Sequence, residues 1–276
     1  MLKRTRSQRR ADSAKHSKVE NSVHTFELGT GATESPFRLP LREKKNRSGC
    51  LHCVESTCCC RWFDAALTKC YASLPIQRKV ESGSRRELCA KSILPEFVSR
   101  LVRITGMDAN VPFFDFGCGN GSVLFQVAFM TGAPCVGIEI HPRNAQVARE
   151  AWDALRPALE RQGGRKLHVE IICGDFCQLL QEEPFLRSFL SRPSVVWAAN
   201  LLLPRPTNHF LSERFRSVPQ GTKILCFEDL YPHARSLARI RDPDAFEKFE
   251  MSDFVWQPDS VEWSRDEGKF YMYSRK

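Results

Sequence analysis

The sequence predicts an α/β domain of the doubly wound class, in which a mostly parallel sheet carries helices on both faces. Short apolar runs alternate with segments of helical periodicity from residue 111 onwards, a pattern typical of parallel strands buried on both sides. The last two runs, at 252–256 and 269–273, lie too close in the chain for a crossover helix, so they predict an antiparallel pair at the sheet edge. With them, a seven-stranded sheet is expected; its parallel strands are predicted at 111–115, 135–140, 167–173, 194–199 and 223–227.

Helices are predicted between these strands and in front of them. Apolar residues at helical spacing mark 123–130, 142–160 and 208–216. The same spacing appears earlier, at 62–70 and 94–102. We therefore expect a helical lead-in before the α/β domain.

The chain divides into three parts by composition. Residues 1–49 hold 12 Lys and Arg against 5 Asp and Glu and are poor in apolar residues, which predicts a basic, disordered tail. Residues 50–110 form the helical, Cys-rich lead-in, and residues 111–276 form the α/β domain. A basic tail suits DNA phosphates; the alternatives are a nuclear import signal or a merely solubilising tail.

The sequence shows no apolar stretch long enough to span a membrane, and no apolar run follows the basic N-terminus as in a secretory signal. We expect no membrane association and a nuclear or cytosolic protein. Its 12 cysteines are then expected to be reduced. The cluster Cys50–Cys70 is compatible with zinc, but adjacent cysteines cannot all bind one ion, so we favour partly buried thiols and no metal.

A glycine-rich turn follows the first predicted strand. Asp115 precedes Gly117, Cys118, Gly119 and Gly121, which lead into a helix at Ser122. Glycines there allow a sharp turn and a close approach of the backbone to a ligand. Nicotinamide and flavin enzymes use the different spacing Gly-x-Gly-x-x-Gly. The acid before the turn suits a cationic amino-acid group, so the turn predicts S-adenosylmethionine as cofactor.

Polar residues also end the next predicted strands. Glu139 stands where doubly wound folds place a carboxylate for ribose hydroxyls. Asp175 and Phe176 suit the amine and the ring of adenine, although Asp175 could equally cap a helix. Asn200 ends the fourth strand, where an amide could orient an amine nucleophile; the alternative is a strand-end cap. These features predict the class I S-adenosylmethionine-dependent methyltransferase fold.

The chain resembles a specific family from about Ala90 to Tyr273: the Dot-type (disruptor of telomeric silencing) histone methyltransferases, in a compact, kinetoplastid-like form. These non-SET enzymes modify a lysine in the globular core of histone H3. The motifs that carry the resemblance are the glycine turn at 115–122, Val136–Glu139, Gly174–Phe176, Ser194–Asn200, His209–Phe215 and Ser260–Ser264.

The resemblance implies roles for individual residues. Asp115, the turn and Ser122 would hold the methionine part, Glu139 the ribose, and Asp175 with Phe176 the adenine. Asn200 matches the second of two paired asparagines and would be catalytic, while Ala199 replaces the first. The lysine channel would be walled by Trp263, Phe270 and Leu203, with Phe270 in place of a usual tyrosine. The family's loop over the cofactor reads Ala90-Lys91-Ser92 here.

The leading hypothesis is therefore a nuclear histone lysine methyltransferase that regulates chromatin, whose partner is the nucleosome, through histone H3 and through DNA at the basic tail. An RNA or DNA methyltransferase is the alternative. Enzymes that methylate base amines commonly stack the target base on an aromatic residue after strand four, whereas Leu201–Leu203 follow here. A third hypothesis is a chromatin-binding module with an inactive cofactor fold.

Overall fold

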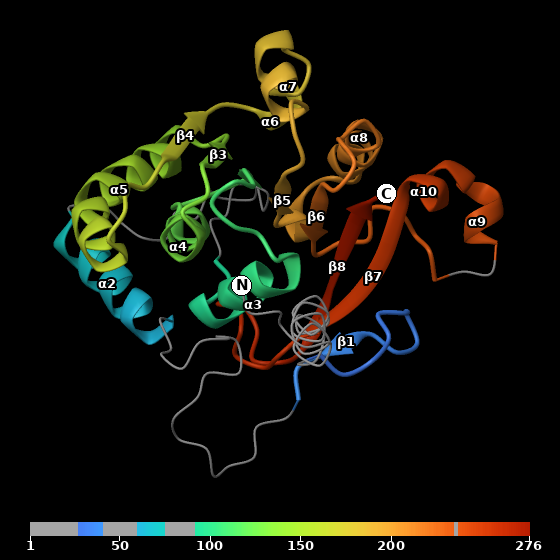
Figure 1. The fold of residues 1–276 in the computed structure, drawn as a ribbon, viewed down its shortest axis with the longest axis horizontal. Helices are drawn as coiled ribbons and strands as arrows, with labels where there is room; N and C mark the ends of the chain where they lie inside the picture. The colour runs from blue at the N-terminus through green and yellow to red at the C-terminus, as the bar shows by residue number, and fades with distance from the viewer. Residues whose placement is uncertain (1–26, 41–59, 75–91, 235–236) are drawn as a thin grey trace, which may run out of the picture.

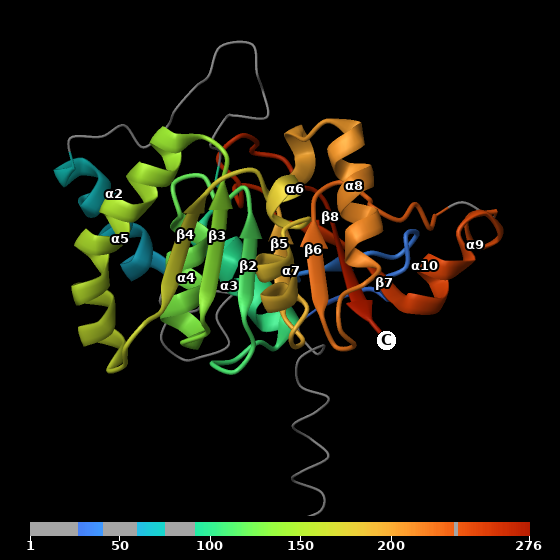
Figure 2. The same ribbon diagram turned by 90° about the horizontal axis from the view of Figure 1, so that it is seen from above.

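The computed structural model describes residues 27–40, 60–74, 92–234 and 237–276. These residues form an eight-stranded sheet in the order β1-β7-β8-β6-β5-β2-β3-β4, with helices packed on both faces (Figure 1, Figure 2). The doubly wound class and the antiparallel edge predicted from the sequence are both confirmed. In the described part of the chain, no helix is long and apolar enough to cross a membrane.

The five predicted parallel strands occur in the expected places. Asp115 lies beside Gly137 on one side and Trp197 on the other, so the ends of three strands meet at one edge. A β-hairpin completes the sheet, with β8 between β6 and β7. The strand bounds are β2 Phe113–Phe116, β3 Cys135–Glu139, β4 Val169–Cys173, β5 Val195–Ala198, β6 Lys223–Cys226, β7 Phe249–Trp256 and β8 Gly268–Arg275.

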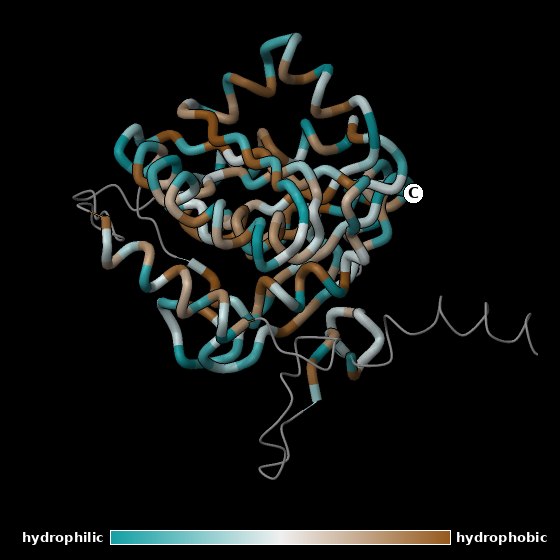
Figure 3. Tube along the Cα trace, turned by 60° about the vertical axis from the view of Figure 1, so that its left-hand side comes forward, coloured by the Kyte–Doolittle hydropathy of each residue, from teal (hydrophilic) through white to brown (hydrophobic). Residues whose placement is uncertain are grey.

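The helices divide between the two faces of the sheet. One face is covered by α2 Cys60–Ser73, α3 Pro95–Thr105, α4 Ser122–Thr131 and α5 Pro142–Gly163, which share one apolar core. The other face carries α6 Phe176–Leu179, α7 Glu183–Phe189, α8 Arg205–Phe215 and α10 Pro243–Lys248 around a second core, and α9 Ala238–Arg241 precedes α10. Polar and apolar residues are interspersed along the chain (Figure 3), whereas α4 is apolar and buried almost all round.

The predicted lead-in packs directly on the sheet. Phe97 of α3 contacts Trp197 of β5 and Phe270 of β8, with ring centroids 6.2 and 4.9 Å away. Tyr71 of α2 donates a hydrogen bond to the carbonyl of Asn120 in the glycine turn. The helices before residue 111 therefore hold the site-bearing end of the sheet in place.

The structure corrects the prediction at the N-terminus, because the sheet gains an eighth strand, β1 Phe37–Arg38, parallel to β7. Residues 27–40, which contain this strand, lie inside the predicted disordered tail. Glu27, at the start of this segment, is buried and forms ion pairs with Arg100 at 2.8 Å and Arg103 at 3.1 Å. Separating these buried charges would leave them without their ion-pair partners, which is costly, so the ion pairs tie this segment to α3. Residues 1–26 and 41–49 of the predicted tail lie outside the described residues.

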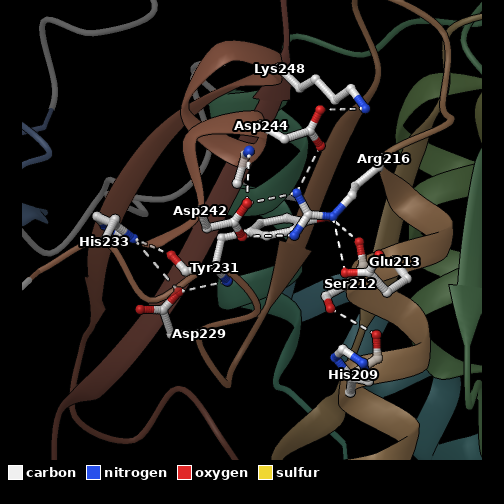
Figure 4. A network of polar contacts seen from close by, with 11 residues as sticks. His209, Ser212, Glu213, Arg216, Asp229, Tyr231, His233, Asp242, Asp244 and Lys248 are labelled. Atoms are coloured by element: carbon white, nitrogen blue, oxygen red, sulfur yellow. Dashed lines mark hydrogen bonds and ion pairs between the residues drawn. The ribbon is translucent and has the colours of Figure 1, made fainter. Parts of the chain in front are cut away.

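A polar network fastens the segment between β6 and β7 to α8 (Figure 4). Arg216, one residue past α8, contacts Asp242 at 2.7 Å and Asp244 at 2.8 Å. Nearby, Nε2 of His233 lies 2.7 Å from Oδ1 of the buried Asp253 on β7. The network lies away from the sheet edge where β2, β3 and β5 end.

Candidate active site

A pocket of about 300 Å³ opens where β2, β3 and β5 end at their carboxyl ends, as expected for a doubly wound sheet. It brings together most of the residues that the sequence singled out. Those lining it are Asp115, Gly117, Cys118, Gly119, Ser122, Glu139, Asp175, Phe176, Leu203 and Trp263. Three of the predicted site residues, Gly121, Asn200 and Phe270, do not line it.

The glycine turn forms the floor of the pocket. Gly117 has φ +93°, a conformation that L side chains rarely adopt, and no atom lies within 4 Å of the place where a Cβ would stand. A ligand can therefore approach the backbone there. Gly121, with φ +83°, instead begins α4, and a Cβ on it would meet the ring of Phe125. Burial raises the pKa of Cys118 well above its usual value, so this residue presents a neutral thiol.

Asp115 is a buried acidic residue that lines the pocket. It is the second-last residue of β2, with 1% of its surface exposed, and its Oδ1 has no hydrogen-bond partner among the described residues. Burial, and then the nearby Glu139, raise its pKa well above the usual value. A buried carboxylate oxygen without a partner is costly, and a cationic ligand in the pocket would supply that partner.

Glu139 ends β3 and holds the turn from the other side. Its Oε2 accepts from Gly119 N at 2.9 Å and its Oε1 from His141 N at 2.8 Å. Burial raises its pKa, while these hydrogen bonds oppose the rise. Each carboxylate oxygen has a second lone pair, so Glu139 can still accept from hydroxyl groups of a ligand.

The two readings of Asp175 do not exclude each other. Asp175 caps α6, because its Oδ1 accepts from Cys177 N at 2.7 Å, and it also lines the pocket. Phe176 stacks on Phe116 with a centroid distance of 5.6 Å and an interplanar angle of 14°. This acid and ring form a second end of the pocket, suited to a flat, amine-bearing group.

Aromatic rings form the opposite end. Phe227 packs edge-on against Trp263 at 5.4 Å and against Trp197 at 5.0 Å, and all three line the pocket. The sequence analysis named only Trp263 of these. Trp197 and Phe227 lie in apolar segments at the ends of β5 and β6, so the sequence alone could not distinguish them from core residues.

Asn200 and Phe270 require correction, because the structure turns both away from the pocket. Asn200 has no exposed surface, and its Oδ1 accepts from the backbone N–H groups of Phe227 and Glu228, at 2.9 and 2.8 Å. The amide thus joins the ends of β5 and β6, as the strand-cap alternative predicted, and Ala199 lines the pocket instead. Phe270 is fully buried against α3, because residues alternate between the two faces of β8.

The cysteine cluster and the predicted cofactor loop are only partly visible. Cys60 and Cys70 are buried in separate contacts, with Ser99 and with the carbonyl of Ala151 respectively. The other cysteines of the cluster, and Ala90 and Lys91 of the loop, lie outside the described residues. Within the described residues, no group of His, Cys, Asp and Glu is arranged to hold a metal ion.

Comparisons with known proteins point to one family. Residues 91–275 match the family described as histone methylation protein DOT1. The chain is 27% identical over 183 residues to a histone-lysine N-methyltransferase, H3 lysine-79 specific, from Mycosarcoma maydis. The aligned region covers 65% of this chain and 22% of that protein. A protein of the same name from Aspergillus fumigatus is 22% identical over 213 residues, covering 76% of this chain and 41% of the relative. The chain thus spans less than half the length of these curated relatives.

Among solved structures, an O-methyltransferase from Bacillus cereus in complex with SAH is 15% identical and has a TM-score of 0.45, covering 78% of this chain and 90% of that one. So low a similarity adds nothing to the fold assignment, which rests on the strand order. The match to the family is of a different kind, because it extends from residue 91, shortly before α3, to Arg275 at the end of β8. The chain belongs to the DOT1 histone methylation family.

Proposed function

We propose that the protein transfers a methyl group from S-adenosylmethionine to a lysine in the globular core of nucleosomal histone H3. The single observation that carries the proposal is the buried, unpartnered Oδ1 of Asp115, in a pocket whose far end is aromatic. The relatives are named as H3 lysine-79 specific methyltransferases, which supports the choice of a histone H3 lysine as acceptor.

The donor set of the pocket fits this cofactor. Oδ1 of Asp115 would accept from the ammonium of the methionine part, and Glu139 would accept from the ribose hydroxyls. The carboxylate oxygen of Asp175 that does not cap α6 would accept from the adenine amine, with Phe176 beside the adenine ring. When bound, the cofactor supplies a methyl group on a positively charged sulfur; the residues named here bind it and fix its orientation.

The aromatic end suits the side chain of a lysine. Trp197, Phe227 and Trp263 offer apolar walls and ring faces to its methylene chain and nitrogen. Apolar surroundings lower the pKa of an entering ammonium, so they favour the neutral amine that is needed as nucleophile. They also exclude water, which would compete for that nitrogen.

We assign a second role, contact with nucleosomal DNA in the nucleus, to the basic N-terminus. Residues 1–26 hold 7 Lys and Arg against 2 Asp and Glu. Deleting them should weaken nucleosome binding and flatten its dependence on salt, because fewer phosphates would be neutralised. Affinity for S-adenosylhomocysteine should stay the same, and an unchanged salt slope would assign the tail to targeting alone.

The function is tested by methyl transfer from labelled S-adenosylmethionine to nucleosomes, free histones and RNA in parallel. We expect label on histone H3 in nucleosomes, which peptide mapping would place on a lysine. Asp115→Asn should abolish it, whereas Asp153→Asn on the exposed face of α5 should not. Label on RNA alone would instead establish a nucleic-acid methyltransferase. Binding of S-adenosylhomocysteine without any transfer would indicate a binding module.

A further inference from the structure

Two chain segments that are far apart in the sequence meet at the rim of the pocket. Ser92 and Ile93, from the segment before α3, line the pocket at the end where Ser122 begins α4. Trp263, from the loop between β7 and β8, lines its aromatic end. The two segments thus line the same cavity although about 170 positions separate them in the sequence.

Backbone hydrogen bonds join these segments as a short antiparallel pair. Ile93 bridges to Val261, and both side chains are buried. Leu94 N donates to Ser260 O at 2.9 Å, and Glu262 N donates to Ser92 O at 3.1 Å. The pair therefore includes the residue directly before Trp263.

The side chain of Glu262 adds to this backbone pairing. Oε2 of Glu262 accepts a hydrogen bond from Ser92 N at 3.1 Å. On the other side of the same residue, the Ser92 hydroxyl lies 3.3 Å from the Ser122 hydroxyl at the glycine turn. A continuous path of hydrogen bonds runs from the turn through Ser92 to Glu262, whose neighbour Trp263 packs edge-on against Phe227.

We propose that Glu262 is a positioning residue that couples the cofactor end of the pocket to its aromatic acceptor end. A ligand that orders Ser92 beside the turn also orders Trp263, because the Glu262 carboxylate and the backbone pair fix the two segments together. By linkage, a filled cofactor end then favours acceptor binding, and an acceptor favours the cofactor to the same extent. This proposal rests on the proposed function for the identity of the two ligands, but its physical content is the coupling of two segments.

Three variants separate the coupling from simple packing. Glu262→Ala removes the carboxylate, whereas Glu262→Gln keeps an oxygen that can accept from Ser92 N. Glu267→Ala is the matched control, because Glu267 lies in the same loop but pairs with the exposed Arg38 instead. Losing the hydrogen bond from Ser92 N to the Glu262 carboxylate, at a partly exposed site, corresponds to about a three- to tenfold effect.

The primary readout is amide hydrogen exchange in residues 92–94 and 260–263, with and without S-adenosylhomocysteine. In the unmodified protein, the ligand should slow exchange in both segments. In Glu262→Ala the protection of 260–263 should fall about three- to tenfold, Glu262→Gln should restore part of it, and Glu267→Ala should match the unmodified protein. Equal protection of 260–263 in Glu262→Ala would overturn the proposal.

A kinetic readout follows on the acceptor that the methyl-transfer assay identifies. Glu262→Ala should raise the acceptor KM about three- to tenfold and leave kcat within about twofold, because the residue positions the acceptor wall and touches no reacting atom. The exchange experiment needs no acceptor. Its outcome therefore remains decisive even if histone H3 proves not to be the substrate, and the two proposals can fail separately.

Discussion

Replacing Asn200 by alanine tests whether its amide holds the sheet or takes part in the chemistry. The side chain is fully buried and makes four hydrogen bonds, two accepted from Phe227 N and Glu228 N and two donated to Asn208 Oδ1 and Glu228 O. In Asn200→Ala both backbone N–H groups lose their acceptor. An unsatisfied buried group costs about 1–3 kcal/mol. Because the bond from Glu228 N is only partly buried, the free energy of unfolding should fall by somewhat less than twice that, about 2–5 kcal/mol.

Urea denaturation followed by fluorescence measures this loss as a shift of the midpoint at constant m-value. Asn208→Ala is the matched control, because it removes one bond from a partly exposed partner and should cost less than about 1 kcal/mol. Methyl transfer per folded molecule should remain measurable in Asn200→Ala. The structural role would be refuted if stability stayed within about 0.5 kcal/mol of the unmodified protein while transfer disappeared.

Other substitutions probe the charged groups. Asp115→Asn should weaken S-adenosylhomocysteine binding at least about tenfold by calorimetry and yet raise the melting temperature near neutral pH. Burial raises the pKa of Asp115 in the folded state, so ionisation of Asp115 destabilises the folded protein as pH rises above the pKa that this residue has in the unfolded chain. A lower melting temperature in Asp115→Asn would contradict this. Glu27→Ala leaves Arg100 buried without its carboxylate and should cost about 3–5 kcal/mol in a denaturation series, against almost nothing for the exposed Glu34→Ala.

A final prediction concerns His233 in the network of Figure 4. Burial opposes its charge, but the Asp229 carboxylate, 3.6 Å from Nδ1, and the hydrogen bond with Asp253 prevail and raise its pKa to about 10. Its stabilising contribution should be complete below the unfolded pKa near 6.5 and decline as pH rises toward 10. Melting temperatures of the unmodified protein and His233→Gln should therefore converge between pH 7 and 10; a constant gap would show that the charge of His233 does not matter.

The sequence by itself determined the class of the fold and the cofactor end of the site. Strands and helices followed from apolar periodicity, which is a local property of the chain. Asp115 and Glu139 could be named because each lies at the carboxyl end of a predicted strand, and the carboxyl ends of neighbouring parallel strands meet at one edge. The glycine turn was recognisable because its backbone conformation, such as φ +93° at Gly117, restricts the residue type.

Only the tertiary structure decided the orientation of side chains and the pairing of distant segments. Asn200 turns inward, because the backbone N–H groups after β6 need an acceptor, and this leaves Ala199 at the pocket. β1 joins the sheet by pairing with β7, and Glu27, in the same N-terminal segment, forms an ion pair with Arg100, 73 positions away. Glu262 reaches Ser92 across 170 positions. Such contacts depend on how whole elements pack, and no local pattern in the chain encodes them.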